Sequence, residues 1–206
     1  STVALYGLLM SASSFDDFPF IETLSAWSTP FYLTQLPEHK HIRADLLHHI
    51  YAQRDAQQAS IASDVGVAAK HALFESDLHF LQAKQPLIEA LRQRLEALLL
   101  MVAEEANQAC WPAEHNAYAA ITESWFHITE NGGYHDAHSH PNCSWCGIYY
   151  VDVGESEFAT RSGINRFYDP RINAEHYLDA GAQYLNQEGV WDIEPEDGQI
   201  VFFPSY

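Results

Sequence analysis

The hydrophobic pattern of this chain changes near Pro112, and the change restricts the folds that the chain can adopt. Before Pro112, apolar residues recur at helical spacing in two long segments. After it, short runs of β-branched and aromatic residues are separated by turn signals at 131–133 and 195–198. A helical half followed by many short strands predicts helices packed against an antiparallel sandwich or barrel.

Two helices are expected in the first half. In one, Ile42, Leu46 and Ile50 recur at every fourth position and mark a single face. The other begins near Pro86, a residue that suits the first turn of a helix. Its apolar stripe consists of Leu87, Leu91, Leu95, Leu98 and Val102. Both stripes are expected to cover a sheet, and residues 60–73 between the helices are expected to form a loop.

The remaining pattern predicts strands. A short one is expected at 31–33, and the later ones lie within 117–130 and at 134–140, 145–153, 158–168, 190–193 and 199–203. Residues 177–189 are ambiguous. We expect residues 1–206 to form a single domain, in which 1–112 is a mostly helical support region and 113–206 is the β-rich core.

The composition excludes some classes of partner. With 10 basic and 28 acidic residues the formal charge is −18, which disfavours nucleic-acid binding and docking on anionic lipid. The longest apolar run, 98–103, is far shorter than the ~20 residues of a membrane span. No Lys or Arg precedes the apolar residues 1–10, which disfavours a signal peptide. Three cysteines do not indicate a disulfide scaffold, so we expect a reducing, cytoplasmic location.

The residues that carry chemistry lie between Tyr134 and Cys146. In a strand, residues two apart share a face, so Tyr134, Asp136, His138 and His140 would point to one side and His135 to the other. Two imidazoles on one face, with a carboxylate beside them, can chelate one ion of Fe(II), Zn(II), Mn(II) or Ni(II). By contrast, we interpret His39, His41 and the pair at 48–49 as background, with the first two on a solvated surface.

Cys143 and Cys146 form a Cys-x-x-Cys pair, for which several readings compete. Structural zinc is one. The zinc deaminase signature fails, because His140 stands where its Glu should be. A redox motif would need the start of a helix in a βαβ unit, whereas the pattern here is β. If this segment is extended, the thiols face opposite sides, and we expect buried, inert cysteines.

These motifs resemble a bacterial and phage group of 2-oxoglutarate/iron(II)-dependent oxygenases. The resemblance rests on His138-x-His140-Pro141 followed by Trp145-x-Gly147-Ile148-Tyr149-Tyr150-Val151. The segments 162–171 and 195–206 match the family's later strands in order, and Thr29-Pro30-Phe31 matches its entry segment. The similarity covers about residues 27–206 and is strongest from 123 onward.

The resemblance implies a double-stranded β-helix, that is a jelly roll of the cupin type, with N-terminal helices. His138 would be the first iron ligand, and His140 stands where the family's carboxylate is usual, so the site would use His140 or recruit Asp136. The family's distal His, and the Arg that binds 2-oxoglutarate, are expected after Tyr206, which makes the sequence a fragment in this interpretation. His176 is a weak substitute for the distal ligand.

Other residues are assigned by the same resemblance. Tyr149 could bond the carboxylate of 2-oxoglutarate, and Trp145 is a second candidate for binding this co-substrate. Trp125, Trp145 and Tyr149 could form the walls of the site, although aromatics at this spacing are more often plain core. His135 could orient a neighbour, with an ordinary surface position as its alternative.

The resulting hypothesis is a non-haem Fe(II)- and 2-oxoglutarate-dependent oxygenase that hydroxylates a small metabolite, an amino acid or a peptide. One alternative is a cupin-like metal-dependent hydrolase or isomerase. The other is a non-catalytic binding protein in which the histidines are merely hydrogen-bonded. The substrate stays open at this stage, as does the oligomeric state, for which a homodimer is one expectation.

Overall fold

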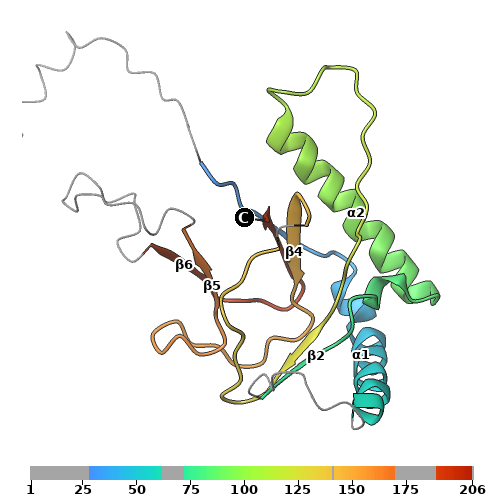
Figure 1. The fold of residues 1–206 in the computed structure, drawn as a ribbon, viewed down its shortest axis with the longest axis vertical. Helices are drawn as coiled ribbons and strands as arrows, with labels where there is room; N and C mark the ends of the chain where they lie inside the picture. Colours follow the sequence, from blue (N-terminus) through green and yellow to red (C-terminus); the bar gives the residue numbers. More distant parts are fainter. Residues whose placement is uncertain (1–27, 62–71, 141, 170–188, 206) are drawn as a thin grey trace, which may run out of the picture.

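A computed structural model describes residues 28–61, 72–140, 142–169 and 189–205 of the chain (Figure 1). Its elements, in chain order, are β1 (Tyr32–Gln35), α1 (His39–Ile61), β2 (Leu73–Glu75), the 3-10 helix η2 (Phe80–Gln82), α2 (Pro86–Asn107), β3 (His127–Thr129), β4 (Trp145–Tyr149), β5 (Asn165–Tyr168), β6 (Val190–Ile193) and β7 (Gln199–Pro204). The helices thus precede most of the strands, as the change of pattern near Pro112 predicts.

The centre of the molecule is an antiparallel sheet with the strand order β1-β7-β4. Tyr32 of β1 and Gly147 of β4 both pair with Phe202, from opposite sides of β7. Ile200, Val201 and Phe202 are all buried, so β7 is covered on both faces. This explains why its sequence is a nearly continuous apolar run without polar alternation.

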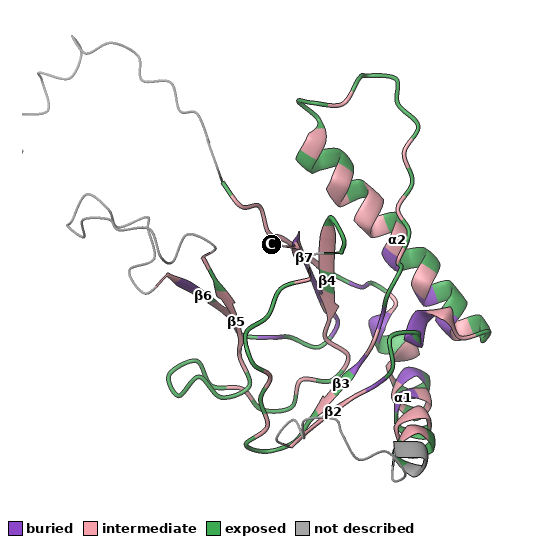
Figure 2. Ribbon diagram, in the orientation of Figure 1, coloured by how far each residue is buried: buried purple, intermediate pink, exposed green. Residues whose placement is uncertain are grey.

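The helices cover one face of this sheet (Figure 2). Leu46 of α1 and Ile88 of α2 have no exposed surface, and both belong to one cluster with Ile200 and Phe202 of β7. Arg94 of α2 donates a hydrogen bond to Glu38, directly before α1. The apolar stripes of both helices therefore face the sheet, as predicted.

An aromatic cluster covers the other face. Phe203 of β7 packs against Phe31 and Phe167, with ring centroids 5.8 and 4.9 Å away, and Trp191 lies 4.6 Å from Phe31. Phe167 and Trp191 are partners in the β5–β6 sheet. The central sheet therefore lies between a helical layer and this second, two-stranded sheet.

A third sheet joins β2 to β3. Phe74 pairs with Ile128, and the ring of Phe126 packs on those of Phe74 and Phe80. Two buried serines join the segment after β2 to the segment before β3. Ser76 Oγ accepts a hydrogen bond from the Phe126 amide, and Ser124 Oγ accepts one from the Leu81 amide. These contacts fix the segment that leads into the candidate site.

Several predicted strands are confirmed and several are wrong. The strand at 190–193 has the predicted bounds, and 199–203 corresponds to β7. The strands expected within 117–130, at 145–153 and at 158–168 are shortened to β3, β4 and β5. The segment 134–140 contains no strand, and this prediction is wrong. The loop at 60–73 and the ambiguous residues 177–189 lie mostly outside the described residues, as does His176.

The expected jelly roll is met only in part. The described residues form three small antiparallel sheets and no closed barrel. None of the helices in the described part of the chain is both long and apolar enough to cross a membrane.

The expectation that His39 lies on a solvated surface is wrong. Its side chain is buried, because α1 packs against the turn between β6 and β7. Gly198 lies directly beneath it: an added Cβ would be 2.8 Å from the imidazole, and the φ of Gly198 is +85°. His41 is exposed, as predicted.

Candidate metal centre

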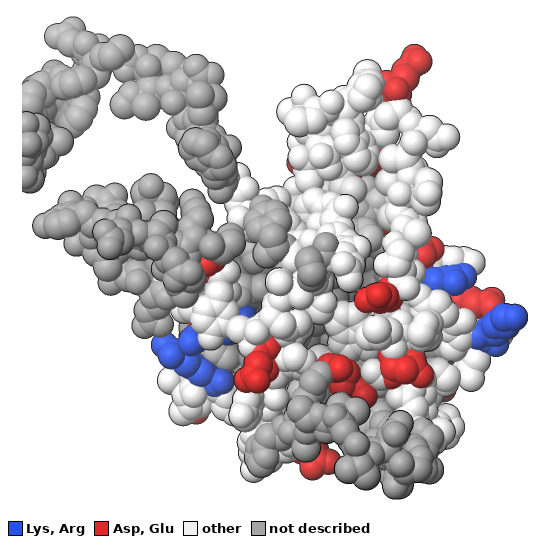
Figure 3. All heavy atoms as spheres, viewed as in Figure 1, with Lys and Arg blue, Asp and Glu red and all other residues white. Residues whose placement is uncertain are grey.

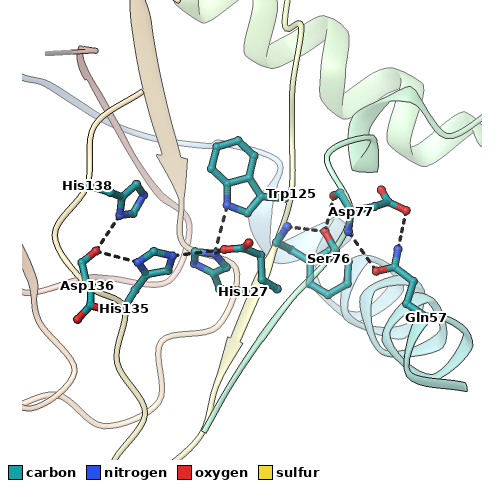
Figure 4. Close-up of polar contacts among 10 residues, drawn as sticks. Gln57, Ser76, Asp77, Trp125, His127, His135, Asp136 and His138 are labelled. Carbon is teal, nitrogen blue, oxygen red and sulfur yellow. Dashed lines mark hydrogen bonds and ion pairs between the residues drawn. The ribbon is translucent and has the colours of Figure 1, made fainter. Parts of the chain in front are cut away.

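His127, His135, His138 and Trp125 gather beside the β2–β3 sheet (Figure 4), and the ring of His140 lies next to those of His138 and Trp125. We call this group, together with Glu75, the histidine cluster; it consists of Glu75, Trp125, His127, His135, His138 and His140. The centroid distances along the cluster are 5.2 Å from His127 to His135, 4.2 Å to His138, 4.7 Å to His140 and 5.1 Å on to Trp125. The indole N–H of Trp125 donates to His127 Nε2 at 3.2 Å, so the rings form a closed circuit.

Sheet register and a turn bring these side chains together. Glu75 of β2 lies directly opposite His127 of β3. The turn after β3 then reverses the chain: the amide of Gly133 donates to the Glu130 carbonyl, and Gly132 has a φ of +77°. The reversal returns His135 to the same edge, where its Nε2 lies 3.4 Å from a carboxylate oxygen of Glu75.

The carbonyl of Asp136 orients two of the rings. It lies 2.8 Å from Nδ1 of His135 and 2.8 Å from Nδ1 of His138. A carbonyl oxygen can only accept, so each Nδ1 carries the proton, and each Nε2 of the neutral ring is left with a free electron pair. A backbone carbonyl on the distal nitrogen is the arrangement that fixes the tautomer of metal-binding histidines.

Glu75, His127 and His135 fit a divalent ion. Their donor atoms all lie within 4.8 Å of one another. Donors bonded to a first-row ion at about 2.1 Å lie about 3 Å apart in adjacent positions. The observed separations from Glu75 Oε2 are 2.8 Å to His127 and 3.4 Å to His135. Two imidazoles and a carboxylate also make the donor set of non-haem Fe(II) oxygenases.

The contacts of His127 give a second reason for a cation. Its Nε2 accepts the indole N–H, which requires a bare nitrogen, yet it lies 2.8 Å from the Glu75 carboxylate, which favours a protonated one. One state of the ring cannot satisfy both contacts. A cation bound by Nε2 and the carboxylate would account for the short contact between these two groups, and the indole N–H would then need another acceptor.

The sequence-predicted ligands lie at the edge of this triad. The rings of His138 and His140 are adjacent and nearly perpendicular. Burial lowers the pKa of His140, and the neighbouring His138 lowers it further. The amide of His140 donates to the Ser205 carbonyl, just after β7. The cluster is thereby tied to the central sheet.

The predicted division of this segment into two faces is wrong. His135, expected on the opposite side, contacts His138 directly. Asp136 is exposed, and the atom that it contributes is its backbone carbonyl rather than its carboxylate. Local bonds from side chains to this carbonyl compete with the ladder of a strand, which is why the alternation fails.

The aromatic candidates divide into two groups. Trp125 lies in the cluster and forms part of its wall. Trp145 packs on Tyr32 of β1, and the hydroxyl of Tyr149 lies 2.7 Å from Nδ1 of His39 in α1. Burial is the main reason why the pKa of Tyr149 is raised to about 12.

Sequence reasoning missed Glu75 and His127. They are 52 positions apart and follow no local motif; only the pairing of β2 with β3 brings them together. The one available signal was the strand-rich composition of 117–130, in which His127 occurs.

Comparison with known proteins agrees with the motifs. Residues 123–206 match the family described as "Putative 2OG-Fe(II) oxygenase". No curated protein matches the chain. The matched segment contains His127, His135, His138 and His140, whereas Glu75 lies before it. The similarity of residues 123–206 to this family supports the family that the sequence motifs indicate.

Proposed function

We propose that this chain acts as a non-haem Fe(II)- and 2-oxoglutarate-dependent oxygenase, built on a jelly roll, and that its histidine cluster holds the iron. The observation that carries the proposal is the convergence of Glu75, His127 and His135. His127 and His135 lie in the segment that matches an oxygenase family, and Glu75 lies before that segment. With iron and 2-oxoglutarate bound, such a site would supply the hydroxylation of a C–H bond.

The residues of this chain would prepare the site in three ways. The Asp136 carbonyl lies 2.8 Å from Nδ1 of both His135 and His138, so in the neutral rings Nε2 is the nitrogen that can bind an ion. Trp125 packs against the ring of His140 and donates its indole N–H to His127, so it bounds the cluster on one side. The β2–β3 register fixes the Glu75 carboxylate against His127. Ligands whose orientation is fixed in advance lose less conformational entropy when the ion binds.

Two ligand sets are distinguished. Glu75, His127 and His135 form the set that geometry favours. His138 and His140 form the set that the family motif favours, and the free Nε2 of His138 supports it. We assign the ion to the first set, with His138 and His140 beside it. The substrate class stays as expected from the sequence, a small metabolite, an amino acid or a peptide, and a homodimer is part of this proposal.

Anaerobic melting of the metal-free chain with Fe(II), and then with 2-oxoglutarate, tests the function. A ligand that binds only the folded state raises the melting temperature. We expect a rise with Fe(II) and a further rise with 2-oxoglutarate. When oxygen is admitted in a separate assay, we expect iron-dependent formation of succinate and carbon dioxide. A metal effect without any 2-oxoglutarate effect would instead indicate a metal-dependent hydrolase or isomerase. If neither Fe(II) nor 2-oxoglutarate changed the melting temperature, the chain would instead be a binding protein that does not use iron.

Variants locate the ion. We expect Glu75→Gln, His127→Ala and His135→Ala to lose the Fe(II)-induced rise. His115→Ala is the matched control, because His115 lies outside the cluster and forms an exposed pair with Glu104, 3.7 Å apart. If His138→Ala and His140→Ala lose the rise while Glu75→Gln keeps it, the family motif holds the ion and our ligand assignment is wrong. Melting without metal shows which variants fold.

A further inference from the structure

Two thiols converge directly after the histidine cluster. Cys143 Sγ and Cys146 Sγ lie 3.7 Å apart, within a sulfur hydrogen bond. Cys143 is exposed and Cys146 is half-buried. The expectation that both cysteines are buried is therefore wrong for Cys143. The expected divergence of the two thiols fails because residues 142–144 form a turn and bend, and the extended backbone of β4 begins only at Trp145.

The convergence is built by contacts with the end of β7. Ser205 Oγ donates to the carbonyl of Cys143, and the Ser205 amide donates to that of Ser144 at 3.3 Å. β4 then pairs with β7 from Trp145 opposite Pro204. Cys146 is thus fixed in a ladder while Cys143 is held by the turn before it. Tertiary contacts, and not the four-residue spacing alone, set the short distance between the thiols.

The two thiols differ in reactivity. The pKa of Cys146 is raised to about 12, mainly because the thiol is half-buried and also because it forms a hydrogen bond with Cys143. The thiolate is the nucleophile in sulfur chemistry, so a buried thiol of this kind reacts slowly with an oxidant. Cys143 is exposed and donates its own S–H to the carbonyl of His140 at 3.4 Å. An oxidant is therefore expected to react first with Cys143, and the neighbouring Cys146 is the thiol that can then form a disulfide with it.

We propose that Cys143 and Cys146 are a site of reversible oxidation, at which a hydroperoxide converts the dithiol into an intramolecular disulfide. The Cys143 thiolate attacks the peroxide O–O bond and becomes a sulfenic acid, while the other oxygen leaves with a proton as water or alcohol. The Cys146 sulfur then attacks the Cys143 sulfur; the S–O bond breaks, and the hydroxyl leaves as water with the Cys146 proton. Two thiols lose two hydrogens in all, and the peroxide is reduced.

The geometry permits this bond with small movements. The sulfurs must approach from 3.7 Å to about 2.0 Å, and rotation of the exposed Cys143 side chain in its turn can supply this change. The product would close a small ring immediately after His140, in the segment pinned to Ser205. This inference concerns the thiols alone and does not depend on iron binding at the cluster.

Intact-mass measurement of the full chain after treatment with hydrogen peroxide tests the site. Trypsin cannot separate the cysteines, because no Lys or Arg lies between Arg94 and Arg161. Cys110→Ser is therefore the starting variant. We expect it to lose both free thiols and about 2 Da, to form no disulfide-linked dimer without reductant, and to recover both thiols with dithiothreitol.

Single variants in that background supply the controls. We expect Cys110→Ser/Cys146→Ser to stop at a sulfenic acid on Cys143 that dimedone traps, and Cys110→Ser/Cys143→Ser to keep its thiol. The chain must also keep its cooperative melting transition while the bond forms. Oxygen addition without loss of hydrogens, disulfides only between chains, or a bond that forms only in urea would each overturn the proposal.

Discussion

The phenol of Tyr149 is held against α1 by one hydrogen-bonding contact with His39, and burial raises its pKa. The hydroxyl is half-buried, and burial disfavours the charged phenolate. The neighbouring carboxylates of Asp197 and Glu38 act in the same direction. A residue expected to bind a co-substrate thus has a structural role in joining a helix to the central sheet.

Tyr149→Phe is expected to change how stability depends on pH. The pKa of Tyr149 is about 12 in the folded chain and about 10 unfolded. Between these two values the folded state keeps the phenol proton, whereas the unfolded state loses it. The contribution of Tyr149 to the free energy of unfolding is therefore complete below about pH 10 and is lost as the pH rises to about 12. Urea unfolding at several pH values should show that the free energy of unfolding falls less between about pH 10 and about pH 12 in the variant than in the parent chain.

The half-buried thiol of Cys146 titrates in an overlapping range, because its pKa is also raised to about 12. Tyr149→Phe and the chain that keeps Tyr149 should therefore both be measured in a Cys146→Ser background. An unchanged slope on replacing Tyr149 in that background would contradict the assigned role of the phenol.

At the scale of elements, the apolar faces of the helices carry the packing. Leu46 is fully buried in α1, whereas Leu33 of β1 is 49% exposed. Leu46→Ala should lower the free energy of unfolding by about 2–5 kcal/mol, because truncation removes buried surface and leaves a cavity. Leu33→Ala is the matched control and should cost much less. Equal losses in urea unfolding would show that α1 does not pack as described.

The β5–β6 sheet is secured by an ion pair. Arg166 donates two hydrogen bonds to the carboxylate of Asp192, at 2.7 and 2.6 Å. Arg166 is the main reason why the pKa of Asp192 is lowered. The stabilisation is therefore present above the unfolded pKa of about 3.9 and is lost as the pH falls through the folded value.

Asp192→Asn should therefore weaken this sheet at neutral pH and reduce its sensitivity to acid. Hydrogen exchange of the β5 and β6 amides measures the effect locally. Glu157→Gln, a change of an exposed carboxylate outside the sheet, is the control. If exchange in both strands is as slow in Asp192→Asn as in the parent chain, the ion pair does not stabilise the sheet.

At the scale of the whole molecule, charge is strongly unbalanced. The formal charge is −18, and Figure 3 shows acidic groups spread over the visible face with basic groups in a few places. Excess charge of one sign destabilises a compact state by self-repulsion. Local pairs such as Arg43 with Asp152, at 2.9 Å, neutralise only part of it.

Salt should therefore stabilise the chain. Raising the ionic strength from about 0.01 M to about 1 M shortens the screening length from about 30 Å to about 3 Å, so the melting temperature should rise. Sodium chloride is suitable, since it is only weakly excluded from protein surfaces. A melting temperature that falls with added salt would mean that attractive pairs outweigh the net repulsion.

The sequence by itself determined the helices, the strands β6 and β7, and the oxygenase motif, because each depends on spacing within a short segment. Burial of β7 on both faces likewise follows from its unbroken apolar run. These features need only local periodicity and the hydrophobic effect.

The candidate site was decided by tertiary structure. Glu75 meets His127 only through the β2–β3 register, and His135 joins them only because the chain reverses at Gly132. The expected strand at 134–140 failed because its side chains bond the Asp136 carbonyl, and the buried state of His39 depends on a turn 159 positions away at Gly198. Contacts between distant segments gain their free energy from packing of the whole fold, and no local pattern of residues records them.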